Sequence, residues 1–277
     1  MRIGLVSDST ADLPSEIQAT YGIEVVPAII NIHGRSYQDG CDITREQFYA
    51  QLPGMKPPPT TSAPSVGAFQ EKYESLLRKG MERIISIHAA NSLSGIFNAA
   101  RLAAQEFSDR VHVIDGGQLS LGTGYQVLTA AEGIRAGARL EVILSRISSV
   151  QKRVRVVALL ESLEYIRRSG RVSWAKAILG NLLRIQPLVE LRYGVVHRLG
   201  QVHTRLPGIS RLKEFLHSLG PLERLAILHT NAETAARHLL DEIRMHVPEL
   251  PFIVNVTTAI GTHVGPNGLG FAIVPVE

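Results

Sequence analysis

A short polar turn in the first half of the chain carries side chains that could bind an anion. It consists of Ser92, Ser94 and Gly95. The isoleucine-rich run over residues 82–90 predicts a buried strand before the turn, and the alanine-rich run over residues 96–104 predicts a helix after it. The start of a helix offers unpaired backbone N–H groups and the positive end of the helix dipole. The serine hydroxyls therefore either hold an anion or cap the helix.

Two further stretches could supply polar groups to a site. Residues 53–65 include three consecutive prolines, which force an extended backbone and predict an ordered loop, and the polar end of this loop, residues 60–65, presents Thr61 and Ser62. Residues 261–270 contain His263 among four glycines, which predicts either a plain turn before the last strand or a loop that closes over a ligand. The first stretch and the serine turn can meet at the carboxyl edge of a parallel sheet, where ligands bind.

The first half of the chain must supply that sheet. Strand and helix signals alternate along it, which predicts an α/β layer structure with mainly parallel pairing. Strands are predicted over residues 2–6, 23–32, 82–90 and 110–114, and helices over residues 14–21, 66–78, 96–104, 119–136 and 141–151. The run over residues 23–32 is interrupted at Pro27, which indicates a sheet edge or a bend there.

The pattern changes after residue 153. Three short strands, predicted over residues 187–191, 195–199 and 201–205, follow one another and indicate an antiparallel meander. Other strands are predicted over residues 154–160, 225–230, 252–256 and 271–274, and helices over residues 174–183, 210–218 and 232–245. We therefore predict two α/β domains, over residues 1–153 and 154–277. The first has a mainly parallel sheet and the second a sheet that includes the meander.

The composition is typical of a globular protein and points away from several classes. The chain has 277 residues, 45% of them hydrophobic, and a net charge of +4. Its basic residues are scattered, so we expect no nucleic-acid binding. The single cysteine, Cys41, excludes an internal disulfide and a cysteine metal cluster. No apolar run reaches the ~18 residues of a spanning helix. We expect no stable membrane insertion, no signal peptide and a cytoplasmic location.

Motifs of common enzyme classes are absent from the sequence. It contains no GxSxG, no GxxxxGK[ST] and no HExxH. The histidines show no close metal-ligand spacing apart from His197 and His203, so we expect no metal site. An enzyme remains the alternative function. Ser94 and His263 in one crevice, with Asp8 or Asp115 nearby, could serve a hydrolase or a phosphotransferase.

Five motifs in order give the chain a resemblance to a known family. They are DSTADLP at residues 8–14, TSAPS at 61–65, LSG at 93–95, SGRVS at 169–173 and HVGP at 263–266. This set resembles the signature of the DegV family and extends over essentially the full chain. The resemblance implies a protein that encloses one long-chain fatty acid, such as palmitate, in a tunnel between its two domains.

The resemblance also implies roles for particular residues. The fatty-acid carboxylate is expected at a site formed by Thr61, Ser62, Ser94, Gly95 and His263. Arg171 is expected either beside the mouth or in docking a partner. That partner is a separate fatty acid kinase, which phosphorylates the carboxylate of the acid presented to it. The chain itself is then a carrier, with no cofactor and no catalytic residue.

The physical chemistry of a fatty acid agrees with this expectation. Burying about fourteen methylenes contributes up to about 11 kcal/mol, whereas a buried carboxylate without partners costs several kcal/mol. The tunnel should therefore supply affinity, and the hydroxyls and amides should orient the head group. Aromatic residues make up only 5% of the chain, so slender aliphatic walls are available. Candidate lining residues are Leu119, Leu160, Leu163, Ile178 and Leu182.

Overall fold

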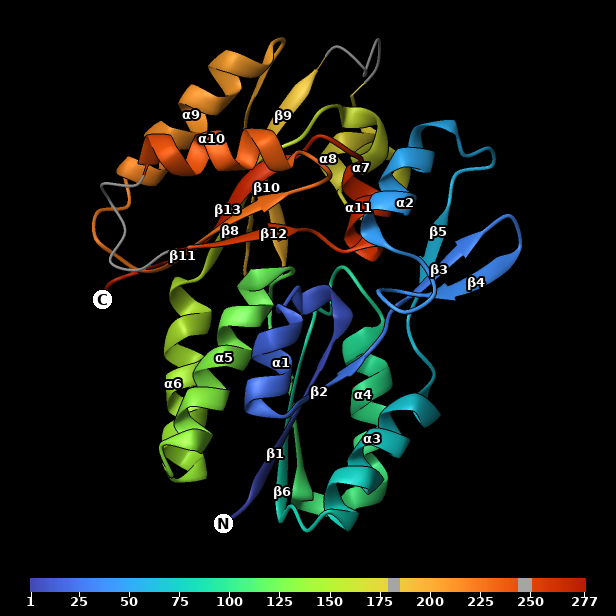
Figure 1. The fold of residues 1–277 in the computed structure, drawn as a ribbon, viewed down its shortest axis with the longest axis vertical. Helices are drawn as coiled ribbons and strands as arrows, with labels where there is room; N and C mark the ends of the chain where they lie inside the picture. Colours follow the sequence, from blue (N-terminus) through green and yellow to red (C-terminus); the bar gives the residue numbers. More distant parts are fainter. Residues whose placement is uncertain (179–184, 244–250) are drawn as a thin grey trace.

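The computed structural model describes residues 1–178, 185–243 and 251–277. Its first sheet is parallel throughout, with the strand order β2-β1-β6-β7 (Figure 1). The four strands are β1 (Ile3–Asp8), β2 (Ile23–Val26), β6 (Arg83–His88) and β7 (Val111–Asp115). The predicted parallel sheet is therefore confirmed, and β2, which ends just before Pro27, lies at its edge.

Helices cover both faces of this sheet (Figure 1). Leu5 and Ile85 face α5 and α6, whereas Val6 and Ile84 face α3 and α4. Strand side chains alternate between the two faces, and this gives each face its own apolar core. The helices are α1 (Ser15–Tyr21), α3 (Val66–Arg78), α4 (Ile96–Ala104), α5 (Leu121–Arg135) and α6 (Leu140–Arg153). Two short 3₁₀ helices, η1 (Ser9–Ala11) and η3 (Gln105–Arg110), follow β1 and α4.

The second sheet comes entirely from residues 155–275 and has the strand order β10-β9-β8-β13-β11-β12. Its strands are β8 (Arg155–Leu159), β9 (Gln186–Arg192), β10 (Val195–Val202), β11 (Leu222–His229), β12 (Phe252–Asn255) and β13 (Leu269–Pro275). Only β11 and β12 pair in parallel, and the other pairs are antiparallel. The α/β class is confirmed, with a parallel first sheet and a mixed second sheet.

The second sheet packs on helices from both halves of the chain (Figure 1). Its outer face is covered by α9 (Arg205–His217) and α10 (Glu233–Ile243). Its inner face packs through Ala226, Leu228 and Ala272 against Tyr125 and Ile143 of α5 and α6. One apolar core thus joins the two halves, and it positions the carboxyl edge of the first sheet below the second sheet.

The meander differs from the prediction in its strands. It consists of β8, β9 and β10, because the strand predicted over residues 195–199 and the first two residues of the one predicted over 201–205 form the single strand β10. The register between β9 and β10 shifts between Arg198 and Gly200, so Gly200 marks a bulge and not a turn. The next helix begins at Arg205, five residues before its predicted start, since Pro207 is tolerated in a first helical turn.

A small third sheet projects from the side of the molecule (Figure 1). It consists of β3 (Ile29–Ile32), β4 (Arg35–Gln38) and β5 (Thr60–Ser62), with β3 in the middle. The loop predicted over residues 53–65 is therefore wrong at residues 60–62, which pair with β3 as a strand. A strand of three residues is too short to show a periodic pattern in the sequence. Between β4 and β5 the chain forms α2 (Arg45–Gln51), which begins with a capping box of Thr44 and Gln47, and η2 (Leu52–Gly54).

Three short helices lie beside one another above the first sheet. They are α7 (Leu163–Ser169), α8 (Ser173–Lys176) and α11 (Thr258–Val264). His263 therefore lies on a helix, although its surroundings predicted a turn or loop. The hydroxyl of Thr257 accepts a hydrogen bond from the N–H of Ile260 at 3.3 Å and caps this helix. The remaining parts of the helices predicted over residues 174–183 and 232–245 extend into segments outside the described residues.

Candidate functional site

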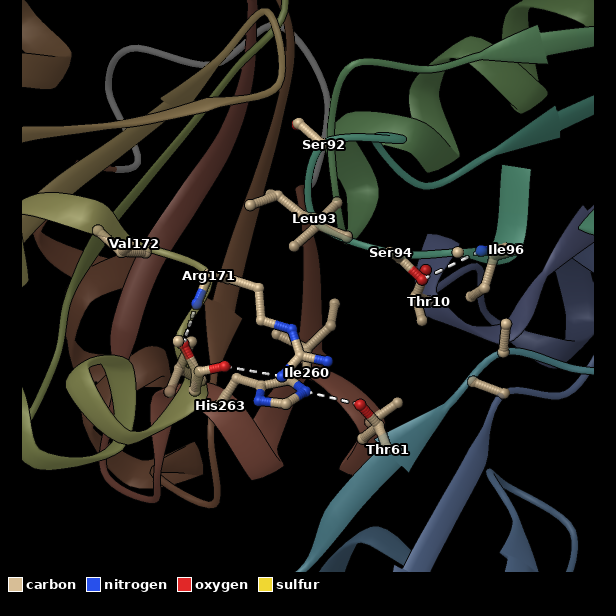
Figure 2. Close-up of a pocket in the computed structure, with 18 of the residues that line it drawn as sticks. Thr10, Thr61, Ser92, Leu93, Ser94, Ile96, Arg171, Val172, Ile260 and His263 are labelled. Atoms are coloured by element: carbon tan, nitrogen blue, oxygen red, sulfur yellow. Dashed lines mark hydrogen bonds between the residues drawn. The ribbon is translucent and has the colours of Figure 1, made fainter. Parts of the chain in front are cut away.

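A cavity of about 590 Å³ lies between the serine turn, β5, the segment after α7 and α11 (Figure 2). All six residues expected at or beside a head group line it: Thr61, Ser62, Ser94, Gly95, Arg171 and His263. They come from both halves of the chain, and the first and last of them are separated by 202 positions. The fold therefore brings the predicted residues together around one space.

Ser94 lies at the start of α4, where the sequence left two roles open. Its Oγ accepts a hydrogen bond from the N–H of Ile96 at 3.3 Å. A hydroxyl that accepts one hydrogen bond keeps its own O–H for donation. Ser94 can therefore serve the helix and a ligand at the same time. Ser92 differs, because its hydroxyl donates to the carbonyl of Gly194 at the β9–β10 turn.

Thr61 and His263 form a direct pair across the cavity (Figure 2). The Thr61 Oγ1 and the His263 Nε2 are 2.7 Å apart. Burial, together with the smaller effect of the nearby guanidinium groups of Arg171 and Arg168, lowers the pKa of His263 to about 3. The imidazole is therefore neutral at pH 7, and it acts through hydrogen bonds and not through charge. Ser62 lies beside this pair, and its Oγ accepts from Asn31 Nδ2 at 3.3 Å.

Arg171 contributes the cationic side chain on the cavity wall. It is exposed to solvent, and its side chain extends across the cavity toward His263 (Figure 2). One guanidinium nitrogen, Nη1, donates to the Ser169 carbonyl at 2.8 Å. This places a positive charge beside the hydroxyl groups of the cavity.

An apolar cavity of about 120 Å³ adjoins the polar one. The two share five lining residues: Leu119, Ile166, Val196, Ile260 and Val264. Of the candidate tunnel residues, Leu119 and Leu160 line the apolar cavity. Leu163 and Ile178 instead pack in the apolar cluster around α7 and α8, and Leu182 lies outside the described residues. The polar cavity thus continues into the apolar cavity between the two halves of the chain.

Several lining residues were not predicted from the sequence. Thr10 lies next to Ser94 in the cavity wall (Figure 2). Its backbone N–H donates to Asp8 Oδ1 at 3.0 Å, and its hydroxyl donates to the same oxygen. The DSTADLP motif was the available signal for this residue. Ile260 was also missed, because it belongs to a helix that the glycine-rich sequence did not indicate.

The groups of the enzyme alternative are engaged elsewhere. The ring of His263 bonds to Thr61, and the charged groups that shift its pKa are arginines and not a carboxylate. Asp8 is buried and accepts from the backbone N–H of Ala89 at 3.2 Å, with His88 Nδ1 2.9 Å away. Asp115 accepts from two backbone N–H groups after β7 and β6. None of these contacts joins Ser94 through His263 to a carboxylate, which is the order that a triad built on this pair would need.

The described residues offer neither a metal cluster nor a membrane-spanning helix. No group of three or more His, Cys, Asp or Glu side chains within residues 1–178, 185–243 and 251–277 could hold a metal ion. Within the same ranges, no helix has both the length and the apolar character needed to cross a bilayer.

Comparison with known proteins gives full-length matches. A family model described as "Uncharacterised protein, DegV family" matches residues 2–276. Protein DegV of Bacillus subtilis is 32% identical over 277 residues, which cover 98% of each chain. The solved structure of a fatty-acid-binding DegV family protein from Thermus thermophilus matches with a TM-score of 0.89 and 32% identity over 100% of both chains. The solved structure of DegV, a fatty-acid-binding protein from Bacillus subtilis, matches with a TM-score of 0.88 and 29% identity, also over 100% of both chains. The order of the motifs, the shared fold and the full-length match together show that this chain belongs to the DegV family.

Proposed function

We propose that this protein binds one long-chain fatty acid, with its carboxylate at the hydroxyl groups of the larger cavity and its tail extending from there into the apolar cavity. The observation that carries the proposal is the direct junction of the two cavities between the halves of the chain. An amphipathic ligand with one anionic end matches such a space. The fatty-acid-binding DegV proteins from Thermus thermophilus and Bacillus subtilis support this assignment.

The head group is proposed to bind to neutral donors. Thr61, Ser62 and Ser94 offer hydroxyls, and the turn at Gly95 offers backbone N–H groups at the start of α4. Hydrogen bonds from such groups offset the several kcal/mol that an unpartnered buried carboxylate costs. His263 lies beside the head group as a neutral partner, and Arg171 adds positive charge at the exposed side.

We propose that the protein is a cytoplasmic carrier without a reaction of its own. A carboxylate beside the exposed Arg171 would be accessible to a second protein, whereas the tail would stay covered. A separate fatty acid kinase that phosphorylates the carboxylate fits this geometry. The hydrolase or phosphotransferase alternative requires a Ser94–His263 pair, and the hydrogen bonds of these two residues do not favour it.

The protein purified from a bacterial host is expected to carry a co-purified fatty acid. Burial of the tail favours retention through washing, since each buried methylene contributes about 0.8 kcal/mol. Native mass spectrometry before denaturation should show one added fatty-acid mass, which should disappear after denaturation. A native mass equal to that of the bare chain, together with no uptake of added palmitate, would contradict the proposal.

Ser94→Ala is expected to raise the Kd for palmitate about tenfold, because the carboxylate loses one hydrogen bond worth about 1.4 kcal/mol. Ser65→Ala is the matched control. Ser65 caps α3 by accepting from the Ala68 N–H at 3.2 Å, and it does not line the cavity. Titration of delipidated protein with palmitate should separate the two variants. Equal affinities would show that Ser94 acts only as a cap.

A further inference from the structure

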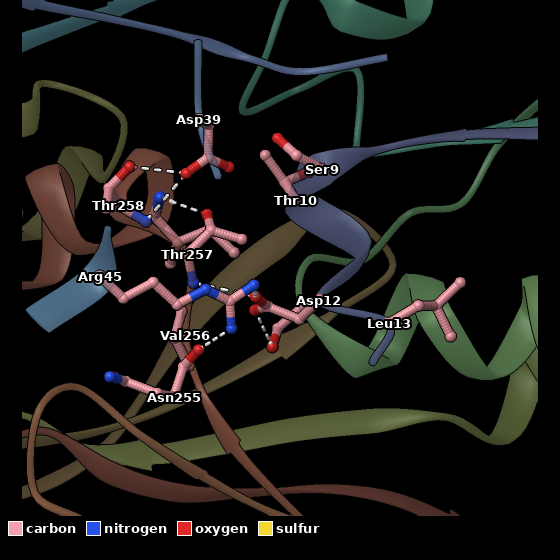
Figure 3. A network of polar contacts seen from close by, with 12 residues as sticks. Ser9, Thr10, Asp12, Leu13, Asp39, Arg45, Asn255, Val256, Thr257 and Thr258 are labelled. Carbon is pink, nitrogen blue, oxygen red and sulfur yellow. Dashed lines mark hydrogen bonds and ion pairs between the residues drawn. The ribbon is translucent and has the colours of Figure 1, made fainter. Parts of the chain in front are cut away.

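The first turn of α11 is held by two carboxylates from distant parts of the chain (Figure 3). The backbone N–H of Thr257 donates to Asp12 Oδ1 at 2.9 Å. The N–H and the hydroxyl of Thr258 both donate to Asp39 Oδ1, at 3.2 and 2.6 Å. Asp12 follows η1 and Asp39 follows β4. Hydrogen bonds to residues next to the first and the third sheet therefore both hold this helix.

The two carboxylates are themselves fixed. Asp12 is buried, lies 3.3 Å from the guanidinium of Arg45 and accepts from Ser120 Oγ at 2.6 Å. Arg45 also donates to the carbonyl of Asn255, just before α11 (Figure 3). Asp39 is 3% exposed. The two carboxylates are therefore held in one position, because moving either of them would leave buried polar atoms without hydrogen-bond partners.

The helix that they hold carries both ends of the proposed ligand site. His263 lies in the polar cavity, whereas Ile260 and Val264 line both cavities at their junction. Gly261 packs against the ring of Tyr49, where a Cβ atom would lie 2.3 Å from the hydroxyl oxygen. A shift of α11 would therefore change the contact between His263 and Thr61 and the width of the junction together.

We propose that Asp12 and Asp39 are positioning residues of the head-group site. They hold α11 by its first turn and so set where His263 and Ile260 stand relative to β5 and the serine turn. Neither carboxylate lines the polar cavity, so both act through the helix. The consequence for ligand affinity rests on the proposed fatty-acid function, whereas the consequence for the His263 ring does not.

Asp39 offers a clean pair of variants. One oxygen, Oδ1, accepts both hydrogen bonds from Thr258, whereas Oδ2 is buried without a partner. Asp39→Asn keeps an acceptor in the Oδ1 position and should preserve both hydrogen bonds from Thr258. Asp39→Ala removes the acceptor and should release the first turn of α11. Glu132→Ala is the control, because Glu132 pairs with Arg224 at 2.5 Å and lies away from α11.

The first measurement uses ligand-free protein and the NMR titration of the His263 ring. Wild type, Asp39→Asn and Glu132→Ala should keep the pKa of His263 far below 6.5. Asp39→Ala should raise it toward 6.5, because a released helix lets water reach the ring. The groups that face this ring, Arg168 and Arg171, are the same in all four proteins. A folded Asp39→Ala with an unchanged His263 titration would overturn the proposal.

The second measurement is the Kd for palmitate. Asp39→Ala should raise it about tenfold, equivalent to about 1.4 kcal/mol, and Asp39→Asn should restore the wild-type value. If wild type does not bind palmitate, the proposed function fails, and the ring titration still decides the positioning role. If Asp39→Ala does not fold, Thr258→Val takes its place, because it removes the hydroxyl donor at equal size. No change in the His263 titration of that variant would overturn the proposal.

Discussion

Val196→Phe is expected to weaken palmitate binding by about 100-fold. Val196 lies on β10 and lines both cavities, so a phenylalanine ring would fill their junction. The apolar cavity holds only about 120 Å³ and cannot absorb a ring without losing space for the tail. Exclusion of about four methylenes costs about 3 kcal/mol, which is on the order of a 100-fold increase in Kd. Titration calorimetry with delipidated protein would measure the Kd for palmitate.

The neighbouring residue supplies the control for this prediction. Val195 precedes Val196 on the same strand, points to the opposite face and is 52% exposed. Val195→Phe should therefore bind palmitate like the wild type, although it introduces the same side chain. Thermal unfolding of both variants would show whether overpacking has disturbed the fold. Full binding by a folded Val196→Phe would show that the tail lies elsewhere.

His263→Gln is expected to change how stability depends on pH. The pKa of His263 is about 3 in the folded protein and about 6.5 in the unfolded chain. Between these values the unfolded chain binds a proton that the folded protein does not. The contribution of His263 to stability is thus complete above pH 6.5 and is lost as the pH falls toward 3. The free energy of unfolding should rise by up to about 1.4 kcal/mol per pH unit in this window.

The variant should lack this dependence, since glutamine does not titrate and its amide can still contact Thr61. The quantity to compare is the difference in unfolding free energy, from urea titrations between about pH 4 and pH 7. Burial raises the pKa of Asp12 to about 7, so Asp12 makes stability fall with rising pH in much of the same range. That effect is common to both proteins and cancels in the difference. A difference that stays flat with pH would mean that His263 is not buried as described.

Much of the fold could be predicted from local sequence patterns. The buried strands of the first sheet and the helices that follow them have strong periodicity, and their type came out correctly. The capping box at Thr44 and Gln47 is another local signal that the structure reproduces. The motifs also named residues that share a cavity, such as Thr61 and His263. Short edge elements were the failures, because three-residue β5 and bulged β10 depend on their partner strands.

The sequence by itself determined which chemical groups are present and which long segments bury their apolar faces. Only the tertiary structure decided that His263 stands on a helix, since α11 is held by carboxylates more than 200 positions away. It also decided that the polar cavity opens into the apolar one, because residues from both halves form that junction. Contacts between distant residues follow from how layers pack, and packing leaves no periodic trace in the chain.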